Sequence, residues 1–286
     1  MSMRVAFLGP AGTFSEDALL AAAGDADIDP LPRPSVYAAI RAVAEGEADR
    51  ALVPFENSIE GAVRSTLDTL AFEAEGITIA GEHDHPIRNS LIARRQIPLE
   101  QVEAVLSHPQ ASAQCARFVR EELPNATVRA AESTADAVRS VASSDEPWAA
   151  LGAASAARIY ECVVLRDGVE DNPDNVTRFV WIAPEGTQPS GAGPWRTTLV
   201  FSELGADHPG ALVEALTEFS SREINLTRIE SRPLRQGLGR YMFFCDLDGA
   251  AEDAPVSEAI QALQGKAESV RILGSYPIAA DGIPGS

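Results

Sequence analysis

The sequence predicts an α/β protein in which a large strand–helix domain is followed by a smaller domain of the ferredoxin-like βαββαβ type. Two observations carry this prediction. Short β-rich runs alternate with alanine-rich helical stretches up to residue 185, and the order of elements changes after a segment rich in Pro, Gly and Ser. Strand–helix alternation is typical of an α/β layer with a largely parallel sheet, and the later order is that of a split βαβ unit.

The first domain is expected to span residues 1–185. Its predicted strands are residues 5–8, 51–53, 77–80, 102–106, 127–130, 149–152 and 179–182. Its predicted helices are residues 15–23, 36–45, 61–72, 111–121, 134–141 and 153–159. The run PEGTQPSGAGP has the composition of a linker, which we place at residues 186–195.

The second domain is expected at residues 196–276, before a tail at 277–286. Predicted strands at 197–201, 224–231, 240–247 and 270–275 alternate with helices at 210–221 and 256–264 in the order βαββαβ. This arrangement is the ferredoxin-like pattern.

Composition narrows the class of function. The 286 residues carry a formal net charge of -19, which disfavours nucleic acid and anionic membranes as partners. No apolar stretch reaches about 20 residues, and the chain enters a predicted strand at residue 5, so we expect a cytoplasmic protein. The three cysteines are scattered without metal-ligand spacing, and His83 and His85 are interpreted as part of a surface turn, so no metal site is predicted.

The segment 175–179 is the most informative polar stretch. Asn175, Thr177 and Arg178 precede an apolar strand, and no catalytic base stands beside the hydroxyl. This arrangement makes a poor nucleophile but supplies hydrogen-bond donors for an anion, and a guanidinium binds a carboxylate through two hydrogen bonds. Because the stretch closes the first domain, its chemistry must be completed by residues far upstream.

Three loops of the first domain follow strands and open helices. In residues 9–16, Thr13 and Glu16 have the spacing of a capping box, so the loop is either a plain helix cap or part of a site. In residues 53–61, the consecutive polar residues Glu56, Asn57 and Ser58 stand at the carboxyl end of a strand, where open α/β sheets bind ligands.

The third loop begins at Ser107. Pro109 suits the first helical position, which places His108 at the N-cap, where it acts either as a cap or as a general acid. Gln110 and Gln114 are four residues apart and share one helix face. Together with free N–H groups at helix N-termini, these loops predict a site for a small carboxylate.

With these segments assembled, the chain resembles prephenate dehydratases that carry a C-terminal ACT domain. The first domain is similar through GPAGTFSEDA, VPFENSIEGAV, SHPQASAQC and NVTRF, and the second through GALV, INLTRIESRP and YMFFCDLDG. The motifs follow the order of the family and cover nearly the whole chain. The resemblance implies a two-lobed catalytic domain like type II periplasmic binding proteins, with lobe 1 at residues 1–76 and 172–185 and lobe 2 at 77–171.

The resemblance also implies the reaction. Prephenate would lose its ring carboxylate as carbon dioxide and its ring hydroxyl as water, without a cofactor, to give phenylpyruvate for phenylalanine biosynthesis. Thr177 would donate to the leaving hydroxyl, with Glu56 as an alternative proton source if burial raised its pKa. The family positions implied as catalytic are Thr177, Glu56, Asn57, Ser107 and Gln114. Those implied as substrate-binding are Thr13, Phe14, Ser58, Asn175, Arg178 and Phe179.

The second domain is implied to regulate the first. L-Phenylalanine would bind between paired ACT domains and inhibit by feedback, which requires a homodimer or homotetramer. The implied contact residues are Gly210, Ala211, Leu212, Val213, Asn225, Leu226, Glu230, Ser231, Arg232 and Pro233, although a helix cap and a strand end with a surface ion pair would explain them structurally. Arogenate dehydratase and a non-catalytic amino-acid-sensing protein remain alternatives.

Overall fold

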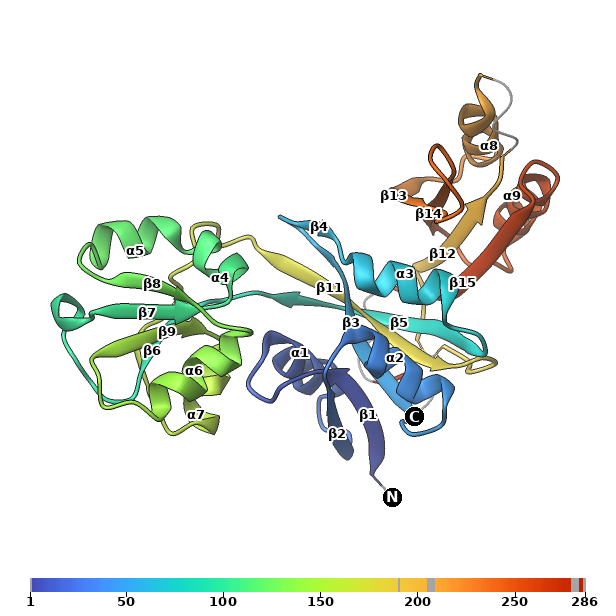
Figure 1. Ribbon diagram of the computed structural model, residues 1–286. Helices are drawn as coiled ribbons and strands as arrows, with labels where there is room; N and C mark the ends of the chain where they lie inside the picture. The colour runs from blue at the N-terminus through green and yellow to red at the C-terminus, as the bar shows by residue number, and fades with distance from the viewer. Residues whose placement is uncertain (1, 190, 205–208, 279–282, 285–286) are drawn as a thin grey trace. The chain divides into compact units, whose positions relative to one another are not determined.

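The computed structural model describes residues 2–189, 191–204, 209–278 and 283–284, and it divides into two compact units (Figure 1). The first unit comprises Met1–Thr66 and Asp84–Phe179, and the second comprises Leu67–His83 and Val180–Ser286. In the described part of the chain, no helix combines the length and the apolar character needed to cross a membrane.

The first sheet has the strand order β2-β1-β3-β11-β5, with β4 paired to β3. Its strands are β1 (Met3–Leu8), β2 (Ile28–Arg33), β3 (Arg50–Asn57), β4 (Gly61–Ala62), β5 (Ile77–Pro86) and β11 (Val176–Pro184). Three helices connect these strands along the chain. Helix α1 (Phe14–Ala23) follows β1, α2 (Val36–Ala44) follows β2, and α3 (Arg64–Phe72) follows β4. Strand β1 runs parallel to both β2 and β3, so the carboxyl ends of these three strands meet at one edge.

The second sheet of the first unit has the order β10-β6-β9-β7-β8. Its strands are β6 (Ser90–Ala93), β7 (Ala104–Ser107), β8 (Thr127–Ala130), β9 (Trp148–Gly152) and β10 (Val163–Arg166). Strand β7 is parallel to β8 and β9, whereas β6 is antiparallel to β9 and β10. The sheet is therefore mixed, and its parallel part carries the loops that open helices.

Two helical layers cover this second sheet, as Figure 1 shows. The helices are α4 (Pro109–Gln114) and α5 (Ala116–Glu122) on one face, and α6 (Thr134–Ala142) and α7 (Ala154–Ile159) on the other. The strand residues alternate between two buried clusters: Val105 packs with the α5 residue Val119, while its neighbour Leu106 packs with the α6 residue Val138. Because both faces of the sheet are buried here, successive residues such as Val105 and Leu106 are both apolar.

The chain passes between the two sheets of the first unit twice, once after β5 and once before β11. Arg88 of the first passage pairs with Glu170 of the second at 2.9 Å, and the other carboxylate oxygen of Glu170 accepts from the Asn89 N–H at 2.8 Å. The Ile87 N–H donates to the carbonyl of Asn175 at 2.8 Å. These bonds fix the start of β11, which carries Thr177, against the first passage.

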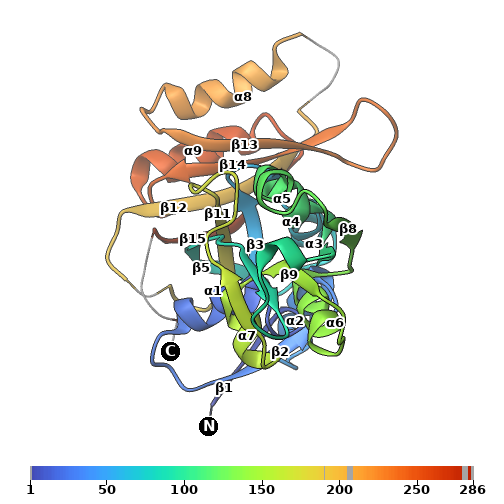
Figure 2. The same cartoon turned by 90° about the vertical axis from the view of Figure 1, so that its left-hand side faces the viewer.

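The second unit contains an antiparallel sheet with the order β13-β14-β12-β15. The predicted βαββαβ order is confirmed by β12 (Trp195–Ser202), α8 (Ala211–Ser220), β13 (Leu226–Pro233), β14 (Tyr241–Asp248), α9 (Ala254–Gln264) and β15 (Ser269–Pro277). Figure 2 shows α8 and α9 beside the sheet. Both helices bury apolar residues in one core with the sheet, including Phe219 from α8, Leu263 from α9 and Leu247 from β14.

Three features of the first unit differ from the elements predicted from sequence. Strands β2, β4, β6 and β10 were not predicted, and β4 takes up the first residues of the helix expected at 61–72, which begins at Arg64. The two prolines of β2 (IDPLPR) weaken its strand signal in the sequence, and the sheet tolerates them because β2 is an edge strand. The expected helix at 111–121 is two helices that meet at Cys115. The expected surface turn at His83 and His85 is wrong, since both residues lie within β5.

Candidate active site

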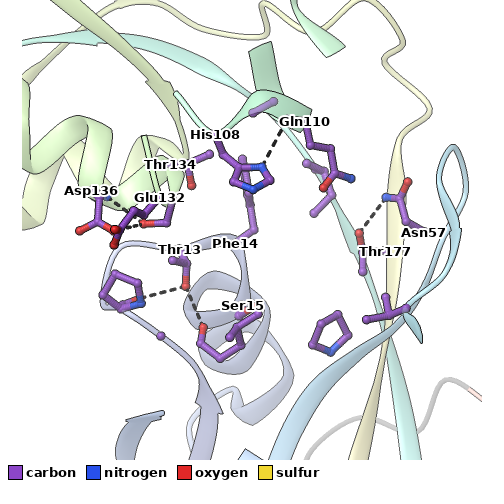
Figure 3. Close-up of a pocket in the computed structure, with 18 of the residues that line it drawn as sticks. Thr13, Phe14, Ser15, Asn57, His108, Gln110, Glu132, Thr134, Asp136 and Thr177 are labelled. Carbon is purple, nitrogen blue, oxygen red and sulfur yellow. Dashed lines mark hydrogen bonds between the residues drawn. The ribbon is translucent and has the colours of Figure 1, made fainter. Parts of the chain in front are cut away.

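A pocket of about 790 Å³ opens in the first unit (Figure 3). It is lined by the loop between β1 and α1, by the ends of β2 and β3, by the starts of α4 and α6, and by β11. The pocket therefore draws on both halves of the unit and sits at the carboxyl ends of β1, β2 and β3, where α/β sheets bind ligands. Its volume suits a small organic molecule.

The segment that runs into β11 presents alternate residues to the pocket, beginning at Asn175, just before the strand. Asn175, Thr177 and Phe179 line it, whereas Val176 and Arg178 do not. Because successive side chains of a strand point to opposite faces, the position of Thr177 in the pocket turns Arg178 away from it. The buried Phe179 ring also meets His85 edge-on, with ring centroids 6.4 Å apart.

The Asn57 side chain fixes the hydroxyl of Thr177. The Oδ1 atom of Asn57 accepts hydrogen bonds from the N–H groups of Ile59 and Glu60, both at 3.0 Å. Two backbone donors identify this atom as the oxygen, so the amide nitrogen is the atom that donates to Thr177 Oγ1 at 2.9 Å. The Thr177 oxygen is thus an acceptor for Asn57, in the hydrogen bond drawn as a dashed line in Figure 3. The Thr177 proton is then directed to a different acceptor, and Thr177 lines the pocket.

A chain of amides extends from this pair. Asn57 also donates to Asn175 Oδ1 at 2.8 Å, and Asn175 donates to Gln114 Oε1 at 3.1 Å. Gln114 belongs to α4, so the chain connects the two halves of the unit. All three amides and Thr177 line the pocket. Because the Gln114 oxygen is an acceptor here, its NH₂ group is left as a donor, and Gln114 lines the pocket.

The loop before α1 places Thr13 and Phe14 in the pocket. The predicted capping box is wrong: the Thr13 hydroxyl donates to the carbonyls of Leu8 and Pro10, and Glu16 accepts from the Gly12 N–H instead. Thr13, the N-cap residue of α1, therefore makes no side-chain hydrogen bond to the first turn of the helix. This helix end retains backbone donors that favour an anion.

Four predicted site residues lie outside the pocket lining. Arg178, whose side chain is 10% exposed, pairs with Glu56 at 2.9 Å, and its guanidinium lies 5.0 Å from the Phe55 ring centroid. The fully buried Ser107 hydroxyl donates to the Leu151 carbonyl at 2.8 Å and so links β7 to β9. Ser58 Oγ accepts from the Val176 N–H at 3.0 Å. These residues support the strands that carry the pocket.

Several residues line the pocket beyond those predicted as catalytic or substrate-binding. The predicted N-cap position of His108 on α4 is confirmed, with Nδ1 accepting from the Gln110 N–H at 3.3 Å, and His108 also lines the pocket. Arg33 enters at the end of β2, a strand that was not predicted. Further polar lining residues are Ser15, Glu132, Ser133, Thr134 and Asp136. Ser133 is the N-cap of α6, and a serine in front of a predicted helix is a signal that could have marked this loop as a further strand-to-helix junction.

The predicted regulatory residues occupy two parts of the second unit. Gly210 adopts a φ of 99° at the N-cap of α8, and Ala211 and Leu212 line a cavity of about 170 Å³. On β13, Arg232 forms a bidentate ion pair with Asp68 of α3, at 2.8 Å to each oxygen.

The remaining predicted regulatory residues have structural partners or exposed positions. Asn225 donates to Asp248 Oδ2 at 2.9 Å, and Leu226 packs against the core of the second unit. Val213 is exposed, and Glu230, Ser231 and Pro233 lie on β13 opposite β14.

The sequence of the chain matches two family models and several named proteins. The family model "Prephenate dehydratase" matches residues 5–187, and the model "ACT domain" matches residues 199–265. A protein named prephenate dehydratase from Mycobacterium marinum is 42% identical over 96% of this chain and 88% of its own length.

Two solved structures are similar across the chain. One, described as prephenate dehydratase in complex with L-Phe from Arthrobacter aurescens, is 42% identical, with a TM-score of 0.89 over 99% of this chain and 92% of that chain. The other, described as GqqA, a novel type of quorum quenching acylases, is 30% identical, with a TM-score of 0.86 over 96% of this chain and 98% of that chain. The chain belongs to the prephenate dehydratase family and carries a C-terminal ACT domain.

Proposed function

We propose that the pocket of the first unit converts prephenate to phenylpyruvate, with Thr177 as the hydrogen-bond donor to the departing hydroxyl. The bond between the ring and its carboxylate breaks, and its electron pair enters the ring as carbon dioxide leaves. The bond between the opposite ring carbon and its hydroxyl breaks with its pair on oxygen. That oxygen takes up one proton and leaves as water, and the ring becomes aromatic.

The orientation of the Asn57 amide is the observation that carries this proposal. Because Asn57 donates to Thr177 Oγ1 at 2.9 Å, the Thr177 proton is directed to another acceptor, and Thr177 lines the pocket. A hydroxyl held in this way can donate a hydrogen bond to the departing oxygen of prephenate, on which negative charge develops. A positioned donor of this kind is worth about 2.7–4 kcal/mol of barrier.

The reaction needs no nucleophile and no strong base. An alcohol is a weak acid, so we assign Thr177 the role of stabilising the departing hydroxide by hydrogen bonding, with the net proton supplied by solvent. Asn57, Asn175 and Gln114 hold this donor through their amide chain. Phe14 and Phe179 line the pocket as the apolar surfaces that suit a six-membered ring.

The remaining predicted site residues receive supporting roles. Glu56 and Arg178 pair on the face of β11 away from Thr177, and Ser58 and Ser107 bind backbone groups. We propose that these four hold the strand ends in register, while Thr13 shapes the first turn of α1 beside the pocket.

The proposal is tested by mixing the purified protein with prephenate and measuring phenylpyruvate, with arogenate offered separately. Phenylpyruvate formation well above the uncatalysed rate supports it, and a preference for arogenate would identify the related dehydratase instead. No product from either substrate would overturn the proposal.

Acyl hydrolysis is the activity named for one structural neighbour, and the pocket geometry does not favour it. Such chemistry needs a hydroxyl or thiol next to a base that takes its proton. Thr177 instead meets the amide of Asn57, which donates, and the Ser107 hydroxyl is buried against the Leu151 carbonyl. Release of an acyl group from an acylated substrate by this chain would contradict that reasoning.

We also propose that L-phenylalanine binds the ACT domain and inhibits the enzyme. The neighbour described as a complex with L-Phe supports this proposal. The predicted contacts are residues 210–213, Asn225, Leu226 and residues 230–233. Calorimetry with L-phenylalanine and rate curves in its presence test it. Absence of both binding and inhibition would contradict it.

Three further expectations stay proposals. We propose a homodimer or homotetramer, because paired ACT domains would form the effector site, and light scattering of the purified protein tests this. We propose a cytoplasmic location, testable by cell fractionation. We propose domains at residues 1–185 and 196–276 with a linker at 186–195, which limited proteolysis would cut first.

A further inference from the structure

The pocket poses an electrostatic problem for the substrate of the proposed function. Prephenate carries two carboxylates, the chain carries a formal net charge of -19, and Glu132 and Asp136 line the pocket. Arg178, the expected carboxylate partner, is turned away and paired with Glu56. Among the described lining residues, Arg33 is the one permanently charged cation.

Arg33 is placed for this role by the first sheet. It ends β2, opposite Leu8 of β1, and its carbonyl accepts from the Gly9 N–H at 2.9 Å. That hydrogen bond joins the end of β2 to the loop that carries Thr13 and opens α1. Arg33 therefore lies at the same end of the sheet as the N-terminus of α1, and both line the pocket. A cation and a helix N-terminus both favour an anion.

The hydrogen-bond state of Arg33 is incomplete within the described chain. Its Nη2 atom pairs with Glu47 at 2.8 Å, and its Nε atom is buried with no acceptor among the described residues. The Glu47 side chain is 56% exposed, so this pair is screened by solvent and contributes little. The pair with Glu47 therefore leaves most of the guanidinium charge uncompensated, and that charge favours an anion in the pocket that Arg33 lines.

We propose that Arg33 binds a substrate carboxylate, and that this is the carboxylate of the pyruvyl side chain. The ring carboxylate loses its charge as it departs as carbon dioxide. A cation bound to it would stabilise the ground state more than the transition state and would slow the reaction. The side-chain carboxylate keeps its charge throughout, so an ion pair there binds substrate, transition state and product alike. This inference rests on the proposed function.

The proposal predicts a specific kinetic pattern for Arg33→Ala. The variant loses an ion pair that stabilises substrate and transition state equally. KM for prephenate therefore rises about 10- to 100-fold, while kcat stays within about threefold of the unmodified protein. The inhibition constant of phenylpyruvate rises by a similar factor, because the product retains the same carboxylate. Arg33→Lys recovers part of the affinity, since a lysine keeps the charge but loses the fork of donors.

Two variants serve as controls. Arg41→Ala removes an arginine on α2 that pairs with Glu45 and does not line the pocket, and it leaves KM unchanged. Glu47→Gln keeps Arg33 and changes KM less than Arg33→Ala does. Circular dichroism confirms that each variant is folded.

Calorimetry with phenylpyruvate separates this inference from the proposed function, because it needs no turnover. If the protein fails to convert prephenate yet binds phenylpyruvate through Arg33, the proposed function fails alone. If Arg33→Ala leaves phenylpyruvate affinity and KM unchanged, or lowers kcat with KM unchanged, the assignment of Arg33 is overturned.

Discussion

The amide nitrogen of Asn57 donates a hydrogen bond to the Thr177 hydroxyl oxygen at 2.9 Å, across 120 positions of sequence. Two backbone N–H groups hold the other end of the same amide. The direction of proton donation at Thr177 is therefore set by the turn that follows β3, and a change in this turn should alter turnover without touching Thr177.

Asn57→Asp tests that direction. A carboxylate would accept the Thr177 proton and remove the donor from the pocket, so we expect kcat to fall at least about 100-fold with a smaller change in KM. Ser58→Ala is the matched control, because it loosens the same loop and keeps Asn57. Equal losses of kcat in the two variants would indicate that Asn57 only anchors the loop.

The pair of Arg232 and Asp68 connects the ACT strand β13 to α3 within the second unit. If the predicted effector segment acts through this contact, Asp68→Ala should keep the basal rate and weaken inhibition by L-phenylalanine. Coupling between sites of this kind is about 1–3 kcal/mol, so the inhibition constant should rise about 5- to 150-fold.

Arg235→Ala provides the comparison for this prediction. Arg235 contacts the same Asp68 oxygen at 2.7 Å, but its side chain is 57% exposed, so its loss should have the smaller effect. An unaltered inhibition curve in Asp68→Ala would exclude this contact as the route of coupling.

Arg196 and Glu82 form a buried ion pair in the second unit, with side chains 15% and 4% exposed and a closest approach of 2.5 Å. Arg196→Ala leaves the Glu82 carboxylate buried beside a missing cation, and we expect a loss of about 3–5 kcal/mol in the free energy of unfolding. Urea unfolding measures it. A loss below about 1 kcal/mol would show that the carboxylate is satisfied without Arg196.

Burial raises the pKa of the Cys115 thiol to about 12, with further contributions from the charges of Glu170 and Asp171, and burial likewise raises the pKa of Cys245 to about 12. Between pH 9 and 12 both thiols stay protonated in the folded protein, whereas in the unfolded chain they ionise with their ordinary pKa of 9.0. Stability should therefore be fully retained below pH 9 and fall as the pH rises from 9 towards 12.

Thiol labelling at neutral pH checks the same cysteines. The partly exposed Cys162 should react in the native protein, and Cys115 and Cys245 should react only after unfolding. Rapid native labelling of all three would contradict the burial of these two side chains.

Much of the site could be predicted from sequence because its loops stand at the ends of recognisable elements. Pro109 marked the start of α4, and the spacing of Gln110 and Gln114 correctly predicted a shared face, since both line the pocket. Asn57 and Thr177 were placed in one site by the resemblance of their motifs, whereas the hydrogen bond between them required the folded chain.

The misses have physical causes. Prolines in IDPLPR weaken the strand signal of β2, so its last residue, Arg33, could not be placed at the sheet edge. Arg178 was expected in the same site as Thr177, although adjacent residues of a strand face opposite ways once its register is known. Thr13 has cap spacing, but its hydroxyl meets nearer carbonyls in the turn before α1.

The central claim is that Thr177 supplies the hydrogen bond that carries the departing hydroxide. Its most direct test is kcat for prephenate in Thr177→Ala and Thr177→Ser, with prephenate affinity measured in both. We expect Thr177→Ala to lose about 10²- to 10³-fold in kcat and Thr177→Ser, which keeps the hydroxyl, to retain most of it. A Thr177→Ala protein that keeps more than about a tenth of kcat would contradict the account.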